Sequence, residues 1–177
     1  MDESELRNSL ADLHSASFAW AMTCCRDREL AENVLQSVYV KVLGSQALHE
    51  GRSAFRTWLF AVIRNAAHDH RRRRWWSRVV RLEFESLAEL PESEANAGVD
   101  SDEENELRMI RAAMTGLPRR QREVAHLVFY EELTVAEAAE VMSVSVGTAR
   151  QHYARAKDSL RVTLQPMWNS RDEATSR

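Results

Sequence analysis

The sequence contains little that bends or cross-links a chain. It has five glycines and three prolines among 177 residues, too few for a turn-rich β fold, so the composition favours helices. Its two cysteines are adjacent, at Cys24 and Cys25. Neighbouring positions on a helix point about 100° apart, so the two thiols are poorly placed to hold one metal ion. We interpret them as small core residues in a reducing compartment.

Several functional signatures are also missing. The longest apolar runs, such as Trp58 to Ile63, are far shorter than a membrane span. The acidic start MDESEL lacks a signal-peptide pattern, so we expect a cytoplasmic protein without membrane insertion. There is no glycine-rich phosphate loop, no HExxH and no nucleophile elbow. The sequence therefore predicts no catalytic residue, no metal and no cofactor.

Charge is distributed very unevenly along the chain. The net charge of −3 argues weakly against nucleic-acid binding when the chain is taken as a whole. However, residues 51–81 contain nine arginines and one acid, whereas residues 82–107 contain ten acids and no lysine or arginine. Blocks of opposite sign indicate parts with different partners.

Apolar periodicity predicts an all-α fold with two small helical domains, an N-terminal bundle and a C-terminal helix-turn-helix domain, joined by an acidic linker. The bundle is expected to contain helices over residues 6–25, 27–43 and 53–73, with Gly44 ending the second and Ser53 capping the third. The predicted boundaries are residues 1–81 for the first domain, 82–105 for the linker, 106–165 for the second domain and 166–177 for a polar tail.

Residues 134–160 carry the strongest functional pattern. A capping-box sequence, Thr134 to Glu137, starts a short helix that is expected to end at Ser143, and Ser145 is placed to cap a second helix. This spacing is typical of a helix-turn-helix, whose second helix enters a DNA major groove. The alternative is a plain helical hairpin with a solvated basic face.

The third predicted helix is the second pattern. Its expected apolar face is Phe55, Trp58, Leu59, Val62, Ile63 and Ala66, and we expect Arg56, Arg64 and the run Arg71 to Arg74 to lie largely elsewhere. Such a basic helix suits a DNA backbone and unstacked bases, although the arginine run also suits a solvated helix end. Trp58 fits a core position, and Trp75 and Trp76 fit base stacking or packing equally well.

These two patterns occur in a recognisable order. A bundle ending in SAFRTWLFAVIRNAAHDHRRRR, an acidic linker, and LPRRQREVAHLVFYEELTVAEAAEVMSVSVGTARQHYARAKDSLR together resemble the extracytoplasmic-function group of bacterial sigma factors. Such proteins keep only the second and fourth conserved regions of the larger sigma factors. The resemblance covers about 150 residues, from Leu10 to Leu164, and the linker matches in character only.

The resemblance implies that the first domain reads an opened −10 promoter element. In the family, a base of the non-template strand is flipped into a pocket beside a loop that corresponds to residues 47–53, and Asn65 matches a polar residue of that pocket. The residues implied in −10 DNA binding are His49, Gly51, Arg52, Ser53, Arg56, Trp58, Arg64, Asn65, Arg71, Arg72, Arg73 and Arg74.

The resemblance also implies partners for the other segments. The segment AENVLQSVYVKVL is similar to the helix that binds the clamp coiled coil of the largest polymerase subunit, through Asn33, Gln36, Ser37 and Val40; the family often has acids where this chain has Asn33 and Ser37. The final domain resembles the reader of the −35 element, which also binds the flap of the second-largest subunit. The residues implied there are Ser145, Thr148, Arg150, Gln151, His152, Arg155 and Lys157.

The expected function is therefore that of a non-enzymatic sigma factor. It would bind core RNA polymerase, recognise −35 and −10 promoter DNA and promote strand opening, with an anti-sigma factor as a further partner. The acidic linker would follow the RNA exit path, or act only as a solubilising spacer. Two alternatives remain open: a helix-turn-helix regulator that acts without polymerase, and a nuclease built on His68 and Asp69. In the turn of the helix-turn-helix, where the family usually has glycine, this chain has Ser143.

Overall fold

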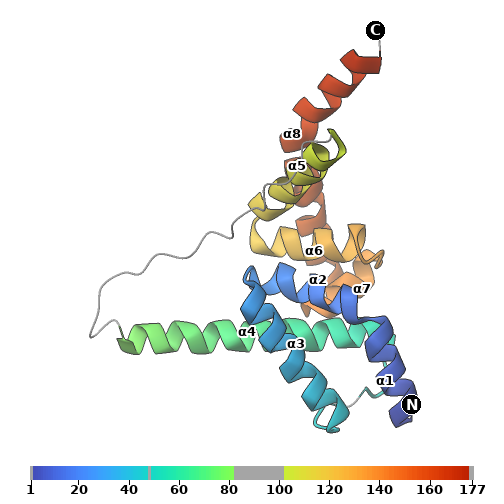
Figure 1. The fold of residues 1–177 in the computed structure, drawn as a ribbon, viewed down its shortest axis with the longest axis vertical. Helices are drawn as coiled ribbons and strands as arrows, with labels where there is room; N and C mark the ends of the chain where they lie inside the picture. The colour runs from blue at the N-terminus through green and yellow to red at the C-terminus, as the bar shows by residue number, and fades with distance from the viewer. Residues whose placement is uncertain (1, 48, 82–101, 176–177) are drawn as a thin grey trace. The chain divides into compact units, whose positions relative to one another are not determined.

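The structure is a computed structural model in which every secondary-structure element of the described residues is an α-helix. The backbone is described for residues 2–47, 49–81 and 102–175, and side chains for residues 2–47, 49–73 and 105–165. The chain divides into two compact units, formed largely by residues 1–94 and 95–177 (Figure 1). Most of the predicted linker, residues 82–101, lies outside the described residues.

The first unit is a bundle of four helices. They are α1 (Glu3–Asp12), α2 (His14–Cys25), α3 (Arg28–Leu43) and α4 (Phe55–Arg81). The prediction of one helix over residues 6–25 is wrong, because the chain leaves helical geometry at Leu13 and divides that stretch into α1 and α2. Apolar periodicity missed this break because the residues on both sides of it are helical and no glycine or proline marks it. By contrast, α3 confirms the prediction, with Asp27 capping its start and Gly44 at its end.

Helices α2, α3 and α4 pack against one another around a core that includes Trp20, Val34, Val38, Phe60 and Ile63, each fully buried. The indole Nε1 of Trp20 donates a hydrogen bond of 2.9 Å to the carbonyl oxygen of Phe60. A buried indole needs such a partner, since leaving its N–H unpaired costs about 1–3 kcal/mol. This bond fixes α4 against α2 at one point along both helices.

Helix α4 differs from the prediction in three respects. It begins at Phe55, and the Trp58 amide bonds to the carbonyl of Ala54, so the cap position is Ala54, one residue after the predicted Ser53. It also continues to Arg81 instead of ending at Arg73. Finally, its buried face contains the predicted Leu59 and Ile63, but its other buried residues differ from the predicted ones and are Thr57, Phe60, Arg64 and Ala67.

The second unit is built from α5 (Asp102–Gly116), α6 (Arg119–Phe129) and α8 (Val146–Thr175), and the short helix α7 (Val135–Met142) leads into α8. Its core includes Met114, Leu117, Ala125 and Ala156, with Leu160 packed against them. Helix α5 starts within the predicted linker, and α8 continues through most of the predicted tail. The predicted start and end of the second domain were placed where apolar periodicity stops. A polar segment can continue a helix beyond that point, so both helices extend past the predicted boundaries.

The capping predictions for α7 and α8 are confirmed. The Glu137 amide donates to Oγ1 of Thr134, and the Thr134 amide donates to the Glu137 carboxylate, at 3.2 and 2.8 Å. Ser145 accepts a bond from the Thr148 amide through Oγ at 3.1 Å. Small buried side chains at Ala138, Ala139 and Ala149 flank the turn between the two helices, as the helix-turn-helix prediction required.

The turn contains a strained residue. Ser143 has a φ of 52°, in the left-handed region that costs a non-glycine residue about 1–2 kcal/mol. We predict that Ser143→Gly raises the stability of the second unit by about 0.5–1 kcal/mol, because relief of strain exceeds the extra unfolded-state entropy of glycine. Urea unfolding followed by circular dichroism measures this difference.

A matched serine two residues later is the control. Ser145→Gly places the same substitution at the α8 cap, where the hydroxyl is used, and is expected to leave stability unchanged or lower it by a few tenths of a kcal/mol. Equal effects of the two substitutions would contradict the assignment of strain to Ser143.

Candidate nucleic-acid interface

An aromatic corner lies where the loop before α4 meets the start of that helix. The ring of His49 packs edge-on against Phe55, with centroids 5.6 Å apart, and lies 5.4 Å from the ring of Trp58. Phe55 and Trp58 are themselves 5.5 Å apart. All three side chains are half-buried. Trp58 is therefore neither a core residue, as first interpreted, nor fully free, and it presents part of its ring to solvent.

One face of α4 is polar and leads away from this corner. Trp58, Asn65 and Arg72 are spaced by seven residues, so they lie on one side of the helix, about 10 Å apart from one to the next. Asn65 and Arg72 are exposed, and the Arg72 guanidinium lies 3.7 Å from the Asp69 carboxylate. The face thus offers a partly open aromatic ring, a carboxamide and a cation in sequence.

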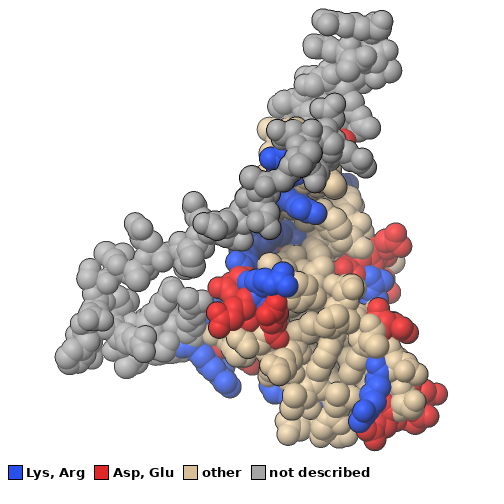
Figure 2. Space-filling view, in the orientation of Figure 1, with Lys and Arg blue, Asp and Glu red and all other residues tan. Residues whose placement is uncertain are grey.

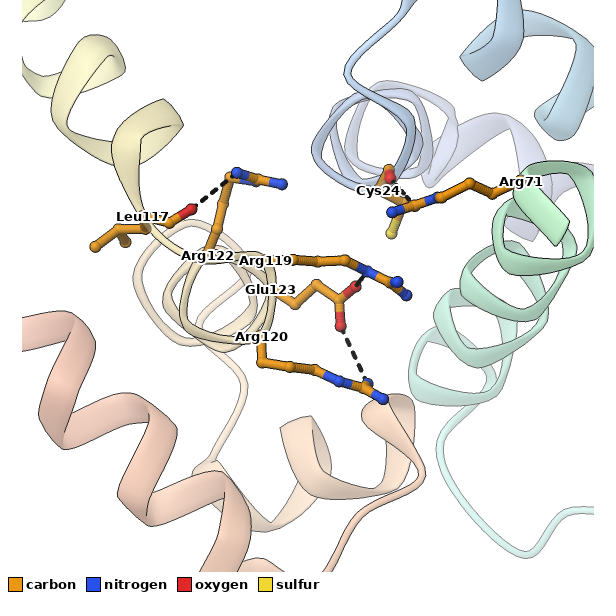
Figure 3. Close-up of polar contacts among 7 residues, drawn as sticks. All are labelled: Cys24, Arg71, Leu117, Arg119, Arg120, Arg122 and Glu123. Carbon is orange, nitrogen blue, oxygen red and sulfur yellow. Dashed lines mark hydrogen bonds and ion pairs between the residues drawn. The ribbon is translucent and has the colours of Figure 1, made fainter. Parts of the chain in front are cut away.

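Three arginines predicted on this interface lie elsewhere. Arg64 is only 2% exposed, so the prediction that it lies outside the buried face is wrong. The guanidinium of Arg71 donates a hydrogen bond to the carbonyl oxygen of Cys24 (Figure 3). Arg56 is half-buried, with its guanidinium 5.5 Å from the centre of the Phe60 ring. The physical reason is shared, because burying Phe60 turns all three toward the packed side of α4.

Arg71 also affects the neighbouring thiol. Burial raises the pKa of Cys25 to about 11, against the opposing effect of the positive charge of Arg71. The thiol therefore stays protonated at neutral pH, and Cys24 is buried beside it. Burial confirms the interpretation of Cys24 as a core residue, whereas Cys25 is half-buried at the edge of the core.

The remaining predicted contacts of this region are exposed or partly exposed. Arg52 forms an ion pair of 2.8 Å with Glu50, in which both side chains are mostly solvated. Gly51 and Arg73 are exposed and Ser53 is half-buried. The side chain of Arg74 lies outside the described residues.

Helix α3 presents its predicted contact residues on one face. Asn33, Gln36 and Val40 are exposed, Val40 to 64%, and Ser37 is half-buried. They lie opposite the buried side chains of the helix, among them Ala31 and Val38. Leu43, which is 43% exposed, lies one turn after Val40 and extends the apolar part of this face.

Helix α8 separates its predicted contact residues by face. Ala149 and Ala156 are buried, whereas Arg150, Gln151 and Arg155 are exposed. The other four predicted residues make contacts within the protein or are partly buried. Ser145 and Thr148 bond to each other in the helix cap, His152 is half-buried, and the Lys157 ammonium lies 4.9 Å from the centre of the Tyr153 ring.

Buried charges on α6 were not anticipated from the sequence. Glu123 is fully buried and accepts from Arg119 at 2.8 Å, with Arg120 at 3.5 Å (Figure 3). Arg122 donates to the Leu117 carbonyl at 3.0 Å. The i, i+4 spacing of Arg119 and Glu123 is a signal that could have predicted their contact, but it does not predict burial.

The residues of the nuclease alternative lie together on α4. His68 and His70 are half-buried and Asp69 is exposed. Among the residues that the structure describes, no group of three or more histidine, cysteine or acidic side chains is arranged to hold a metal ion. Within the same residues, no helix is both long and apolar enough to cross a membrane.

Comparison with known proteins connects both units to one family. Residues 11–77 match the model of sigma-70 region 2, and residues 113–162 match that of sigma-70 region 4. The chain is 30% identical over 149 residues to the RNA polymerase sigma-H factor of Pseudomonas aeruginosa, covering 80% of this chain and 76% of that one. It is 30% identical over 140 residues to the ECF RNA polymerase sigma factor SigC of Mycobacterium tuberculosis, covering 77% and 71%. The chain belongs to the ECF group of RNA polymerase sigma factors.

Two solved structures share the fold. Sigma factor RpoE of Bartonella quintana, in a co-crystal with the anti-sigma factor NepR, matches over 91% of this chain and 97% of its own, with a TM-score of 0.71 and 22% identity. CnrH, in complex with the cytosolic domain of CnrY, matches over 93% and 90%, with a TM-score of 0.63 and 19% identity. As a sigma factor, this chain acts in transcription initiation with RNA polymerase and promoter DNA, which replaces the alternative of a polymerase-independent regulator.

Proposed function

We propose that the two units of this sigma factor divide promoter recognition between them. The first unit would bind the polymerase clamp and the opened −10 strand, and the second would read the −35 duplex. The observation that carries the proposal is that α4 and α8 each bury one face and expose a polar face with the side chains that such DNA requires. The protein would be non-enzymatic and cytoplasmic.

The exposed face of α8 supports the −35 assignment. Ser145 and Thr148 cap the helix, so they hold the start of a recognition helix in shape and leave base contact to the next turns. Arg150 and Arg155 suit guanine edges or phosphates, and Gln151 suits an adenine edge. His152 and Lys157 lie beside this face and are assigned to backbone contacts.

The polar face of α4 supports the −10 assignment. The unpaired bases of a single strand stack on aromatic side chains and bond to carboxamides through their polar edges, and the phosphates of the strand bind cations. Trp58, Asn65 and Arg72 offer these groups in that order along about 21 Å of helix. Arg52 and Arg73, both exposed, add charge at the two ends. Arg56, Arg64 and Arg71 stabilise the bundle in this proposal and do not hold phosphates.

The exposed face of α3 supports clamp binding. Val40 and Leu43 place apolar surface next to the polar Asn33 and Gln36, a mixture typical of protein interfaces with an apolar centre and a polar rim. Since Asn33 and Ser37 replace acids frequent in the family, binding would depend on shape and neutral hydrogen bonds more than on charge pairing.

A groove in the second unit supports binding of the polymerase flap. It lies between α5 and α8, has a volume of about 380 Å³, and is lined by residues including Met109, Leu117, Pro118 and Leu164. Leu107 and Met109 remain 47% and 40% exposed on α5. An apolar helix from a partner could fill such a groove.

Control by an anti-sigma factor is supported by the relatives. Both solved structures of the same fold contain a protein partner, and for the sigma factor RpoE of Bartonella quintana that partner is an anti-sigma factor. The exposed apolar residues of α3 and α5 would be the surfaces to cover, because covering them would exclude polymerase.

The −35 assignment predicts a defined loss of sequence preference. Arg150→Ala is expected to weaken transcription from the preferred −35 sequence about tenfold, because a good arginine–guanine contact contributes roughly 1–3 kcal/mol of discrimination. In vitro transcription with core polymerase on −35 variants measures it. Arg161→Ala, which removes the same charge farther along α8, serves as the control. An equal loss in both variants would show a general charge effect and contradict base reading.

The −10 assignment predicts that Asn65→Ala impairs melting more than polymerase binding. Loss of one hydrogen bond to a flipped base is expected to reduce open-complex formation about threefold to tenfold. Permanganate reactivity of unpaired thymines measures opening, and fluorescence anisotropy measures association with core polymerase. Asn8→Ala, an exposed asparagine on α1, is the matched control. If Asn65→Ala reduces both quantities equally, Asn65 does not belong to a base pocket.

A further inference from the structure

The loop before α4 is closed by a side chain. Nε2 of His49 lies 2.7 Å from the carbonyl oxygen of Ser53. A carbonyl oxygen only accepts, so Nε2 carries the hydrogen and donates it. The bond joins the first and last residues of the arc 49–53, and the same imidazole packs against Phe55 and Trp58. His49 therefore ties the loop to itself and to the first turn of α4.

The backbone of the arc has little else to hold it. Among the described residues 49–53, no backbone–backbone hydrogen bond crosses the arc. Gly51 stands at its centre with a φ of 72°, in open space, and the Glu50–Arg52 ion pair is largely solvated. A solvated ion pair contributes little, about 0–1 kcal/mol. The half-buried His49 contact is thus the main restraint on the shape of the arc.

We propose that His49 is a positioning residue that sets which −10 base the loop accepts, by holding residues 50–52 in one conformation without touching the base itself. This inference rests on the proposed function, because it concerns the loop assigned to the −10 strand. A preformed loop discriminates between bases better than a mobile loop, because it loses less conformational entropy when a base binds.

The chemistry of the imidazole distinguishes positioning from base reading. Nε2 is occupied by Ser53, so only Nδ1 is left to meet a base. Positioning therefore predicts that loop order and base preference are lost and regained together in variants of His49, whereas base reading through Nδ1 predicts that base preference is lost while the loop stays ordered.

The first test uses the free protein. Backbone amide NMR order parameters of Gly51 and Arg52 are compared in wild type, His49→Gln, His49→Phe and His49→Ala. Glutamine keeps an N–H donor, and phenylalanine keeps only the ring packing. We expect lower order parameters for both amides in the phenylalanine and alanine variants, and partial rescue in the glutamine variant. His14→Ala, an exposed histidine on α2, is the control and should leave these amides unchanged.

The second test uses the same variants with core polymerase and templates carrying each base at the flipped position, and it measures open-complex formation. We expect His49→Phe and His49→Ala to reduce the ratio of open-complex formation between the best and the worst base at least threefold, with polymerase binding unchanged, and His49→Gln to restore part of this ratio. Unchanged preference in all variants, or a preference lost in a variant whose loop stays ordered, would overturn the inference. Failure of wild type to open any promoter would instead overturn the proposed function.

Discussion

The burial of one face of α4 is the constraint on which the rest of the first unit depends. Phe60 places its ring in the core and its carbonyl oxygen on the Trp20 indole, so both the rotation and the position of the helix along its axis are fixed. Successive residues differ by about 100°, and a rotation by one residue would exchange buried and exposed side chains. This packing directs Asn65 and Arg72 outward and Arg64 inward. The polar face is therefore a consequence of where the apolar core lies.

The same logic holds in α8, where buried Ala149 and Ala156 determine that Arg150 and Arg155 are exposed. Figure 2 shows the described Lys and Arg side chains of the face in view in small groups next to Asp and Glu, with no continuous basic surface. With a net charge of −3, such a protein should bind free DNA weakly. Two weak sites become effective when a scaffold presents both to one promoter, because the second contact is then intramolecular.

Local signals in the sequence predicted the local structure well. The predicted caps at Thr134 and Ser145 have their expected hydrogen bonds, because capping depends on residues three positions apart, whereas the predicted cap at Ser53 is wrong by one position. The phase of α4 was harder, since residues 57–63 are apolar nearly all round and two buried faces fit equally. The bond from Arg71 to the Cys24 carbonyl joins residues 47 positions apart, so it depends on tertiary packing that no local pattern encodes. The candidate DNA residues came from the family resemblance, whereas their sorting into exposed and buried required the fold.

The central claim is that the chain acts on promoter DNA only as part of a polymerase holoenzyme. A mobility-shift measurement on one cognate promoter at moderate salt, with the chain alone, with core polymerase alone and with both, tests it most directly. The account predicts a stable, heparin-resistant complex only when both are present, with unpaired bases at the −10 element. A stable, sequence-specific complex formed by the chain alone with equal affinity would contradict it.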